Sequence, residues 1–182
     1  CVTPYIQEAL ARVLCGEWDH KDEIVVFSTE DARRENWADR SGENGTEPGL
    51  GSRLSSLKIS APVSRVPIHE ASTVDEIWEI FQRIMERIDE GDEIYLDITN
   101  SFRSIPMLAV ILLSYARVVK NISVGGIYYG ALEALGSPGD VRRMVPDERY
   151  VPVFDLTGFS VLQEWVFATH SFLRHGNPAG LV

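Results

Sequence analysis

The chain has 182 residues, of which 45% are hydrophobic and 24% are charged, and its formal net charge is −10. This length and composition suit one globular domain with a sizeable core. The acidic balance argues against a long nucleic acid bound on a broad basic face, but it is compatible with a small anion held by a few local donors.

Cysteine content and hydropathy argue against a disulfide-rich, metal-binding or membrane-spanning protein. Cys1 and Cys15 are too few for a disulfide framework and have no metal-ligand spacing. Arg103 and Arg117 bracket the longest apolar run, which is shorter than a membrane span of about 18 residues. We therefore expect a cytoplasmic protein with no membrane contact, no metal and no other cofactor.

The first third of the chain predicts a helix, a strand and a second helix. Thr3 and Pro4 are typical of a helix start, and the apolar residues that follow predict a face that packs on a sheet: Tyr5, Ile6, Ala9, Leu10, Val13 and Leu14. Residues 23–28 read as a buried strand and 29–38 as a polar helix, in which Trp37 is either a core residue or a ligand platform. Residues 40–56, rich in Gly, Ser and Asn, are predicted to form a mobile loop or insertion.

The middle of the chain predicts a strand at 64–68, followed by His69, which either faces solvent or contacts a ligand. Thr73 and Glu76 have the spacing of a capping box and open an amphipathic helix that we expect to reach Asp89. Its predicted core residues are Ile77, Trp78, Phe81, Ile84, Met85 and Ile88. A buried strand at 94–98 comes next, then a polar turn and a helix with Pro106 in its first turn and Ser104 as N-cap.

The last third predicts a strand at 122–129, in which Gly125 and Gly126 allow either a bulge or a close backbone approach. A loop at 135–150 and a strand at 151–156 follow. Thr157 is expected to cap the last helix, whose apolar set is Phe159, Leu162, Trp165, Val166 and Phe172. The alternation of strands and helices predicts an α/β, Rossmann-like fold with a mostly parallel sheet and helices on both faces.

Such folds usually begin with a strand, whereas the first predicted element here is a helix. We therefore expect a first strand that precedes Cys1 and is missing from this chain.

The turn at 97–103 carries the most chemistry. Asp97, Thr99, Asn100, Ser101 and Arg103 follow a buried strand and precede a helix. A helix N-terminus offers unpaired N–H groups and a positive dipole end, which favour an anion such as a phosphate. Ligands of open α/β sheets bind where strands end and helices begin.

The same residues resemble a known family. Asp-Ile-Thr-Asn-Ser-Phe-Arg-Ser-Ile-Pro at 97–106 is similar to the signature turn of CRISPR-associated Rossmann-fold (CARF) domains, in the branch often joined to a HEPN ribonuclease. Further similar segments occur in the family's order: Thr3 to Leu10, Asn36-Trp37, residues 77–81, Tyr128 to Ala131 and Phe154 to Thr157. The resemblance implies a sensing domain at 1–175 and the start of a linker at 176–182.

The resemblance also implies a ligand and an assembly. CARF domains bind a cyclic oligoadenylate, the second messenger of type III CRISPR antiviral defence, across a homodimer, and the bound ring regulates a fused effector. The residues implied to bind the ring are Asp97, Thr99, Asn100, Ser101, Phe102, Arg103, Ser104, Tyr129, Gly130 and Ala131.

Structural alternatives exist for two of these residues. Asp97 can cap its own turn through backbone N–H groups, and Arg103 can pair with Asp97 or Asp155. The family commonly has His-Gly where this chain has Asn100-Ser101, and Asn does not titrate near neutral pH as His does.

Two further functions stay open. One is a metal-independent ring nuclease that cleaves its own messenger by placing a ribose hydroxyl in line with the adjacent phosphate. The other is an interaction domain that binds no nucleotide. Arg174 and His175 are adjacent and lack the HEPN spacing, so any such effector is expected beyond Val182.

Overall fold

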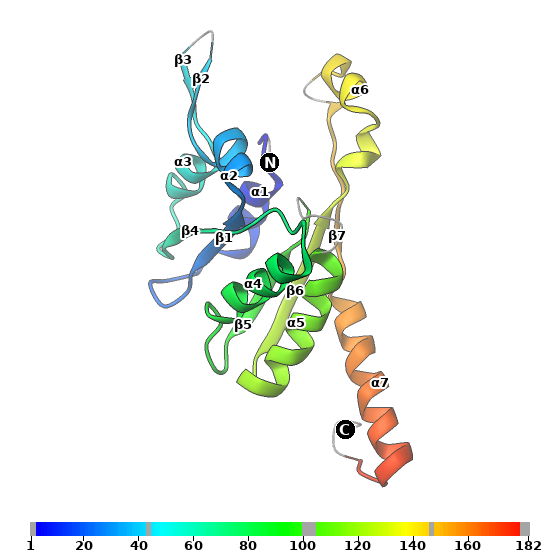
Figure 1. The fold of residues 1–182 in the computed structure, drawn as a ribbon. Coiled ribbons are helices and arrows are strands. Elements are labelled where there is room, and N and C mark those ends of the chain that lie inside the picture. Colours follow the sequence, from blue (N-terminus) through cyan, green and yellow to red (C-terminus); the bar gives the residue numbers. More distant parts are fainter. Residues whose placement is uncertain (1–2, 43–44, 100–104, 146–147, 179–182) are drawn as a thin grey trace. The chain divides into compact units, whose positions relative to one another are not determined.

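The computed structural model describes residues 3–42, 45–99, 105–145 and 148–178 (Figure 1). The chain divides into two compact units, Cys1–Arg87 (unit 1) and Ile88–Val182 (unit 2). The expectation of a sensing domain over 1–175 and a linker start at 176–182 stays a prediction.

Unit 1 has two parallel strands, a hairpin and several helices. Its elements are α1 (Ile6–Leu14), β1 (Ile24–Ser28), α2 (Glu30–Ala32), the π-helical turn η1 (Arg33–Trp37), β2 (Arg40–Gly42), β3 (Gly45–Glu47), α3 (Leu50–Ser55), β4 (Val63–Pro67) and α4 (Val74–Met85). Strand β1 pairs with β4 in parallel, from Ile24 opposite Val63 to Ser28 opposite Pro67.

The core of unit 1 joins α1 to α3. Ala11 and Cys15 from the first helix are buried against Leu50 and Leu54 from the third, and Trp37 packs on the same cluster. A Cβ added at Gly51 would lie 2.8 Å from the Trp37 ring, so the ring rests directly on the α3 backbone. This packing favours the core interpretation of Trp37 over a ligand platform.

Of the two interpretations of residues 40–56, a mobile loop or an insertion, the mobile loop was wrong. Strands β2 and β3 form an antiparallel hairpin, and α3 follows it. Gly, Ser and Asn correctly indicated turns. The helix could have been predicted from Leu50 and Leu54, which are four residues apart and therefore lie on one helix face.

The helix boundaries in unit 1 also differ from expectation. Helix α1 begins at Ile6 with Tyr5 as N-cap, and α4 ends at Met85 rather than Asp89. On α4, Ile80 is buried, whereas Trp78, which the helical period placed inside, is 59% exposed.

Unit 2 is a three-stranded sheet with two long helices. Its elements are β5 (Glu93–Asp97), α5 (Ile105–Lys120), β6 (Ser123–Gly130), the 3₁₀ turn η2 (Leu132–Leu135), α6 (Pro138–Arg143), β7 (Val153–Asp155) and α7 (Thr157–His175). Strand β6 is central, parallel to β5 and antiparallel to β7. The predicted loop at 135–150 was therefore partly wrong, because Ser137 and Asp140 form a capping box that starts α6.

The adjacent glycines Gly125 and Gly126 lie where the pairing of β5 with β6 shifts its register. Ile94 and Tyr95 of β5 lie opposite Val124 and Gly126, so Gly125 is an extra residue, which confirms the bulge interpretation. A Cβ added at Gly125 would stand 2.4 Å from the Tyr95 ring. The bulge thus makes room for an aromatic side chain of the neighbouring strand.

The predicted fold class is confirmed: the chain is α/β and compatible with a Rossmann-like fold, with β1–β4 and β5–β6 as its parallel pairs. None of the described helices combines the length and apolar content that crossing a lipid bilayer requires.

Candidate functional site

The carboxyl ends of β5 and β6 form the candidate site. Because the two strands are parallel, the segments that follow β5 and β6 leave the sheet at the same edge, as the sequence predicted. The Ile98 N–H donates to the carbonyl of Tyr128 at 3.0 Å. The Gly130 N–H donates to Oγ1 of Thr99 at 2.8 Å, so residues 97–99 and 128–130 lie side by side.

A carboxylate and a hydroxyl organise the start of the turn. Oδ1 of Asp97 accepts the Thr99 N–H at 3.0 Å and the Thr99 hydroxyl at 2.5 Å. This geometry agrees with the alternative in which Asp97 caps its own turn. The Thr99 hydroxyl thereby bridges the Asp97 carboxylate and the Gly130 backbone.

Near its carboxyl end, β6 carries the aromatic residue Tyr129. The Tyr129 hydroxyl donates to Oε1 of Glu133 at 2.5 Å. This bond raises the pKa of Tyr129 and lowers the pKa of Glu133. Gly130 and Ala131 are buried, and the Ala131 N–H donates to the carbonyl of Pro152 at 3.0 Å.

The centre of the predicted site lies outside the described residues. Asn100, Ser101, Phe102, Arg103 and Ser104 fall there, so their roles, and that of Ser104 as N-cap of α5, stay predictions. The structure brings together Asp97, Thr99, Tyr129, Gly130 and Ala131, half of the predicted set.

A second Asp-x-Thr turn, which the sequence analysis missed, lies on the other side of β6. Oδ1 of Asp155 accepts the Thr157 N–H at 2.9 Å and the Thr157 hydroxyl at 2.5 Å. Oγ1 of Thr157 accepts the Ile127 N–H at 3.0 Å. The prediction that Thr157 caps α7 was wrong, because Leu156 is the N-cap and Thr157 is the first residue of the helix. This second turn could have been found from the sequence. The Asp-x-Thr spacing occurs twice, at Asp97 with Thr99 and at Asp155 with Thr157, each time where a strand ends.

The hydrogen bonds from Thr157 have an electrostatic consequence. They lower the pKa of Asp155. Nearby, burial and the Asp155 carboxylate raise the pKa of Tyr128.

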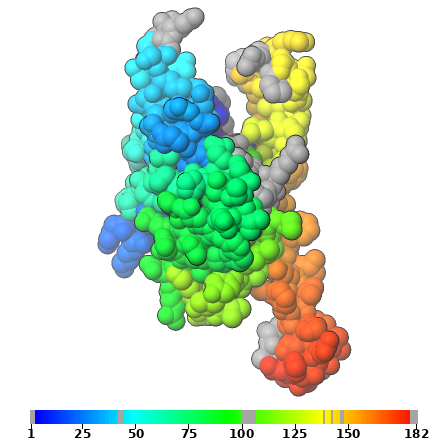
Figure 2. All heavy atoms as spheres, in the orientation of Figure 1, coloured from blue at the N-terminus to red at the C-terminus, as the bar shows by residue number. Residues whose placement is uncertain are grey.

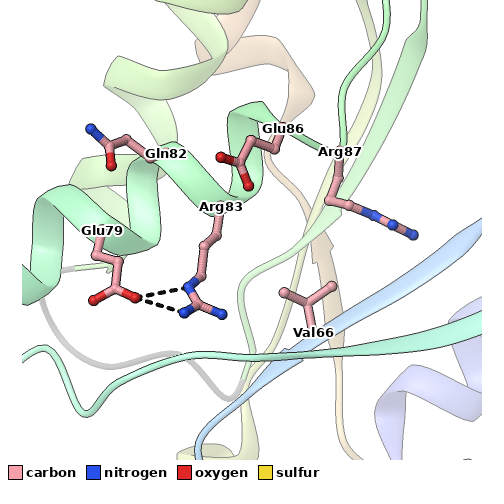
Figure 3. A pocket seen from close by; sticks show the side chains of 6 residues that line it. All are labelled: Val66, Glu79, Gln82, Arg83, Glu86 and Arg87. Atoms are coloured by element: carbon pink, nitrogen blue, oxygen red, sulfur yellow. Dashed lines mark hydrogen bonds and ion pairs between the residues drawn. The ribbon is translucent and has the colours of Figure 1, made fainter.

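Unit 1 has a shallow hollow of ≈ 500 Å³ along α4, lined by Val66, Glu79, Gln82, Arg83, Glu86 and Arg87 (Figure 3). Arg83 donates two hydrogen bonds to Oε1 of Glu79, the shorter at 2.7 Å, and Arg87 pairs with Glu23. Since carboxylates already neutralise both arginines, the hollow offers an anion little net attraction.

Unit 1 also contains a buried carboxylate, that of Glu8. Glu8 is 1% exposed and accepts hydrogen bonds from Arg53, Arg12 and Thr3. Burial raises its pKa, but these bonds outweigh burial and lower the pKa to about 2. Burial and the Asp22 carboxylate raise the pKa of the Cys15 thiol to about 11. In the described part of the chain, no three His, Cys, Asp or Glu side chains gather as a metal site would require.

One comparison with known proteins finds a relative. Over 106 residues the chain is 39% identical to CRISPR-associated protein MJ1674 of Methanocaldococcus jannaschii. The match covers 57% of this chain and 15% of that protein. No protein-family profile matches the chain.

Proposed function

We propose that this chain is a CARF-type sensing domain of type III CRISPR defence, which binds a cyclic oligoadenylate across a homodimer. Its similarity to a CRISPR-associated protein supports this function. The observation that carries the proposal is the edge where the turn after β5 meets the end of β6, joined by the Thr99–Gly130 hydrogen bond.

The electrostatics of this edge suit phosphates despite the acidic chain. Helix α5 runs for 16 residues from Ile105, and Arg103 stands two positions before its first residue in the sequence. Two helix N-termini and two Arg103 side chains in a dimer would supply about +3, counting ~0.5 charge per helix end. This charge offsets most of the negative charge of a ring of four adenylates.

Two apolar helix faces support the dimer. On α5, exposed large apolar side chains are Met107, Val110, Ile111, Tyr115, Val118 and Val119. On α7, whose residues are coloured orange to red in Figure 2, they are Phe159, Val161, Leu162, Trp165, Val166, Phe167, Phe172 and Leu173. An ion pair between Arg117 and Glu164 at 2.5 Å joins the two helices.

A contiguous apolar helix face is normally covered by another part of a protein or by a partner. A second copy of this chain would cover these faces. A two-fold dimer would also offer matching half-sites to a two-fold ring.

In this proposal, ring binding regulates an effector joined to the domain, such as a HEPN ribonuclease. The chain spans 15% of the length of its matched relative. The identity and activity of any such effector are therefore part of the proposal.

The experiment is a thermal-shift titration of the intact protein with rings of three, four and six adenylates. A ring at ~100 times its dissociation constant should stabilise the folded state by about 2.7 kcal/mol. Arg103→Ala should abolish the shift, and Arg149→Ala, an exposed arginine outside the proposed site, should retain it. Melting curves unchanged by every ring would overturn the proposal in favour of a ligand-independent interaction domain.

The incubated rings also report on catalysis. Chromatography after incubation separates intact rings from linear products. Intact rings would fit a pure sensor. Linear products that disappear with Arg103→Ala would identify the chain as a ring nuclease as well.

A further inference from the structure

We propose that Thr99 is a positioning residue, whose hydroxyl holds residues 97–99, where the proposed ring site begins, against the end of β6 and donates no hydrogen bond to the ring. The proposal rests on the proposed function and reassigns one residue of that site. It follows from the hydrogen bonds of the Thr99 side chain.

The Thr99 hydroxyl has one proton to donate. That proton goes to Oδ1 of Asp97 at 2.5 Å, a bond to a carboxylate and therefore among the stronger hydrogen bonds in proteins. A phosphate oxygen is an acceptor and needs a donor. Thr99 could serve a phosphate only by breaking its bond to Asp97.

The oxygen of the same hydroxyl also accepts a hydrogen bond from the backbone. Oγ1 accepts the N–H of Gly130 at 2.8 Å, and Gly130 is buried. A buried backbone N–H left without an acceptor is destabilising, so this bond favours the observed position of the turn. Asp97 fixes the hydroxyl, and the hydroxyl fixes the turn to Gly130.

The second Asp-x-Thr turn provides a matched comparison within the same sheet. Thr157 makes the same bonds, to Asp155 and to the Ile127 N–H, but it opens α7 instead of leading to the proposed ring site. Loss of either hydroxyl removes equivalent hydrogen bonds from β6. Only Thr99 directly precedes the residues that we propose to bind the ring.

The test measures the affinity of the intact protein for cyclic tetra-adenylate and cyclic hexa-adenylate. Thr99→Val, which has the same shape without the hydroxyl, should weaken the tighter ring at least about tenfold, as expected from one lost hydrogen bond to a charged group. Thr99→Ser keeps the hydroxyl and should bind within about twofold of wild type. Thr157→Val should also retain wild-type affinity.

Wild-type affinity in Thr99→Val would overturn the proposal. A loss in Thr99→Ser as large as that in Thr99→Val would also overturn it, because the methyl group would then contact the ring. If wild type binds neither ring, the proposed function fails together with the role of Thr99. If wild type binds and Thr99→Val binds equally, only the role of Thr99 fails.

A second measurement does not need the valine variant to fold. Hydrogen exchange of the Gly130 amide should be slow in wild type and in Thr99→Ser, without ligand and with a bound ring. An amide that exchanges at an open-chain rate in wild type, or that loses protection when the ring binds, would contradict a Thr99–Gly130 bond that holds the turn in the bound state.

Discussion

Glu8 links the stability of unit 1 to pH. Its side chain is buried, and hydrogen bonds from Arg53, Thr3 and Arg12 hold its pKa at about 2, against an ordinary 4.5. A carboxyl group whose pKa is lower in the folded state stabilises the protein above its unfolded pKa and loses that contribution as pH falls through the folded pKa. A difference of this size corresponds to about 3 kcal/mol.

We therefore expect the unfolding free energy of unit 1 to fall by about 3 kcal/mol between pH 5 and pH 2. Glu8→Gln should remove that part of the pH dependence and destabilise the protein at pH 7 by a similar amount, because it leaves Arg53 without its carboxylate. Urea unfolding followed across this pH range measures both effects.

Arg12 supplies the matched control for Glu8. Its side chain is 49% exposed, whereas that of Arg53 is 25% exposed, and both contact the same carboxylate. Arg12→Gln should lower stability by less than about 1 kcal/mol, because the Arg12 side chain is half exposed and Arg53 still pairs with Glu8. An Arg12 variant that matches Glu8→Gln, or a Glu8→Gln protein with unchanged pH dependence, would contradict this account.

The chemistry of single residues was only partly readable from the sequence. The capping role of Asp97 follows from its spacing to Thr99, because Asp often accepts the N–H two residues later. The bond from Gly130 to Thr99 could not be predicted, because it joins residues far apart in the chain that only the parallel pairing of β5 and β6 brings together.

At the scale of elements, α3 is the clearest correction to the sequence-based prediction. Leu54 is 2% exposed in the core that α3 shares with α1. Leu54→Ala should lower the unfolding free energy by about 2–5 kcal/mol, as a buried leucine truncation does. Chemical denaturation measures the loss. Ser55→Ala, exposed on the same helix, should change it by less than ~0.5 kcal/mol. Equal, small effects of the two variants would support the mobile loop instead.

We predict that the exposed apolar face of α7 forms the dimer interface. Leu162 and Trp165 are 59% and 52% exposed, so replacing both with Ser removes little packing within the chain. The double variant should be monomeric by light scattering, while wild type and His170→Ser have the mass of a dimer. A wild-type monomer, or a double variant that stays dimeric, would contradict the assignment of this face.

Elements with a strong local signal were predicted well, and those set by distant contacts were not. The strands near 24–28, 94–98 and 122–129 are present, as their β-branched and aromatic residues favour. The outward orientation of Phe159 and Trp165 was not predictable, because an apolar period marks a face but does not say whether this chain or a partner covers it.

At the scale of the whole molecule, length predicted one domain, and the described residues form two compact units. Hydropathy and length do not determine how strands group into sheets. Pairing of β1 with β4, and of β5 with β6, is decided by contacts between residues far apart in sequence. The expected strand before Cys1 stays a prediction.

Net charge is the other property of the whole chain that bears on function. At −10, the chain should repel a long polyanion, and any phosphate ligand depends on donors gathered at one place. The turn after β5, ahead of the α5 N-terminus, is the place that we propose.

Calorimetric titration of the intact protein with cyclic tetra-adenylate and cyclic hexa-adenylate tests this central claim most directly. We expect one ring to bind per two chains, with binding lost in Arg103→Ala and weaker for the linear oligoadenylate of the same length. The absence of binding by either ring, or one ring bound per monomeric chain, would contradict the account.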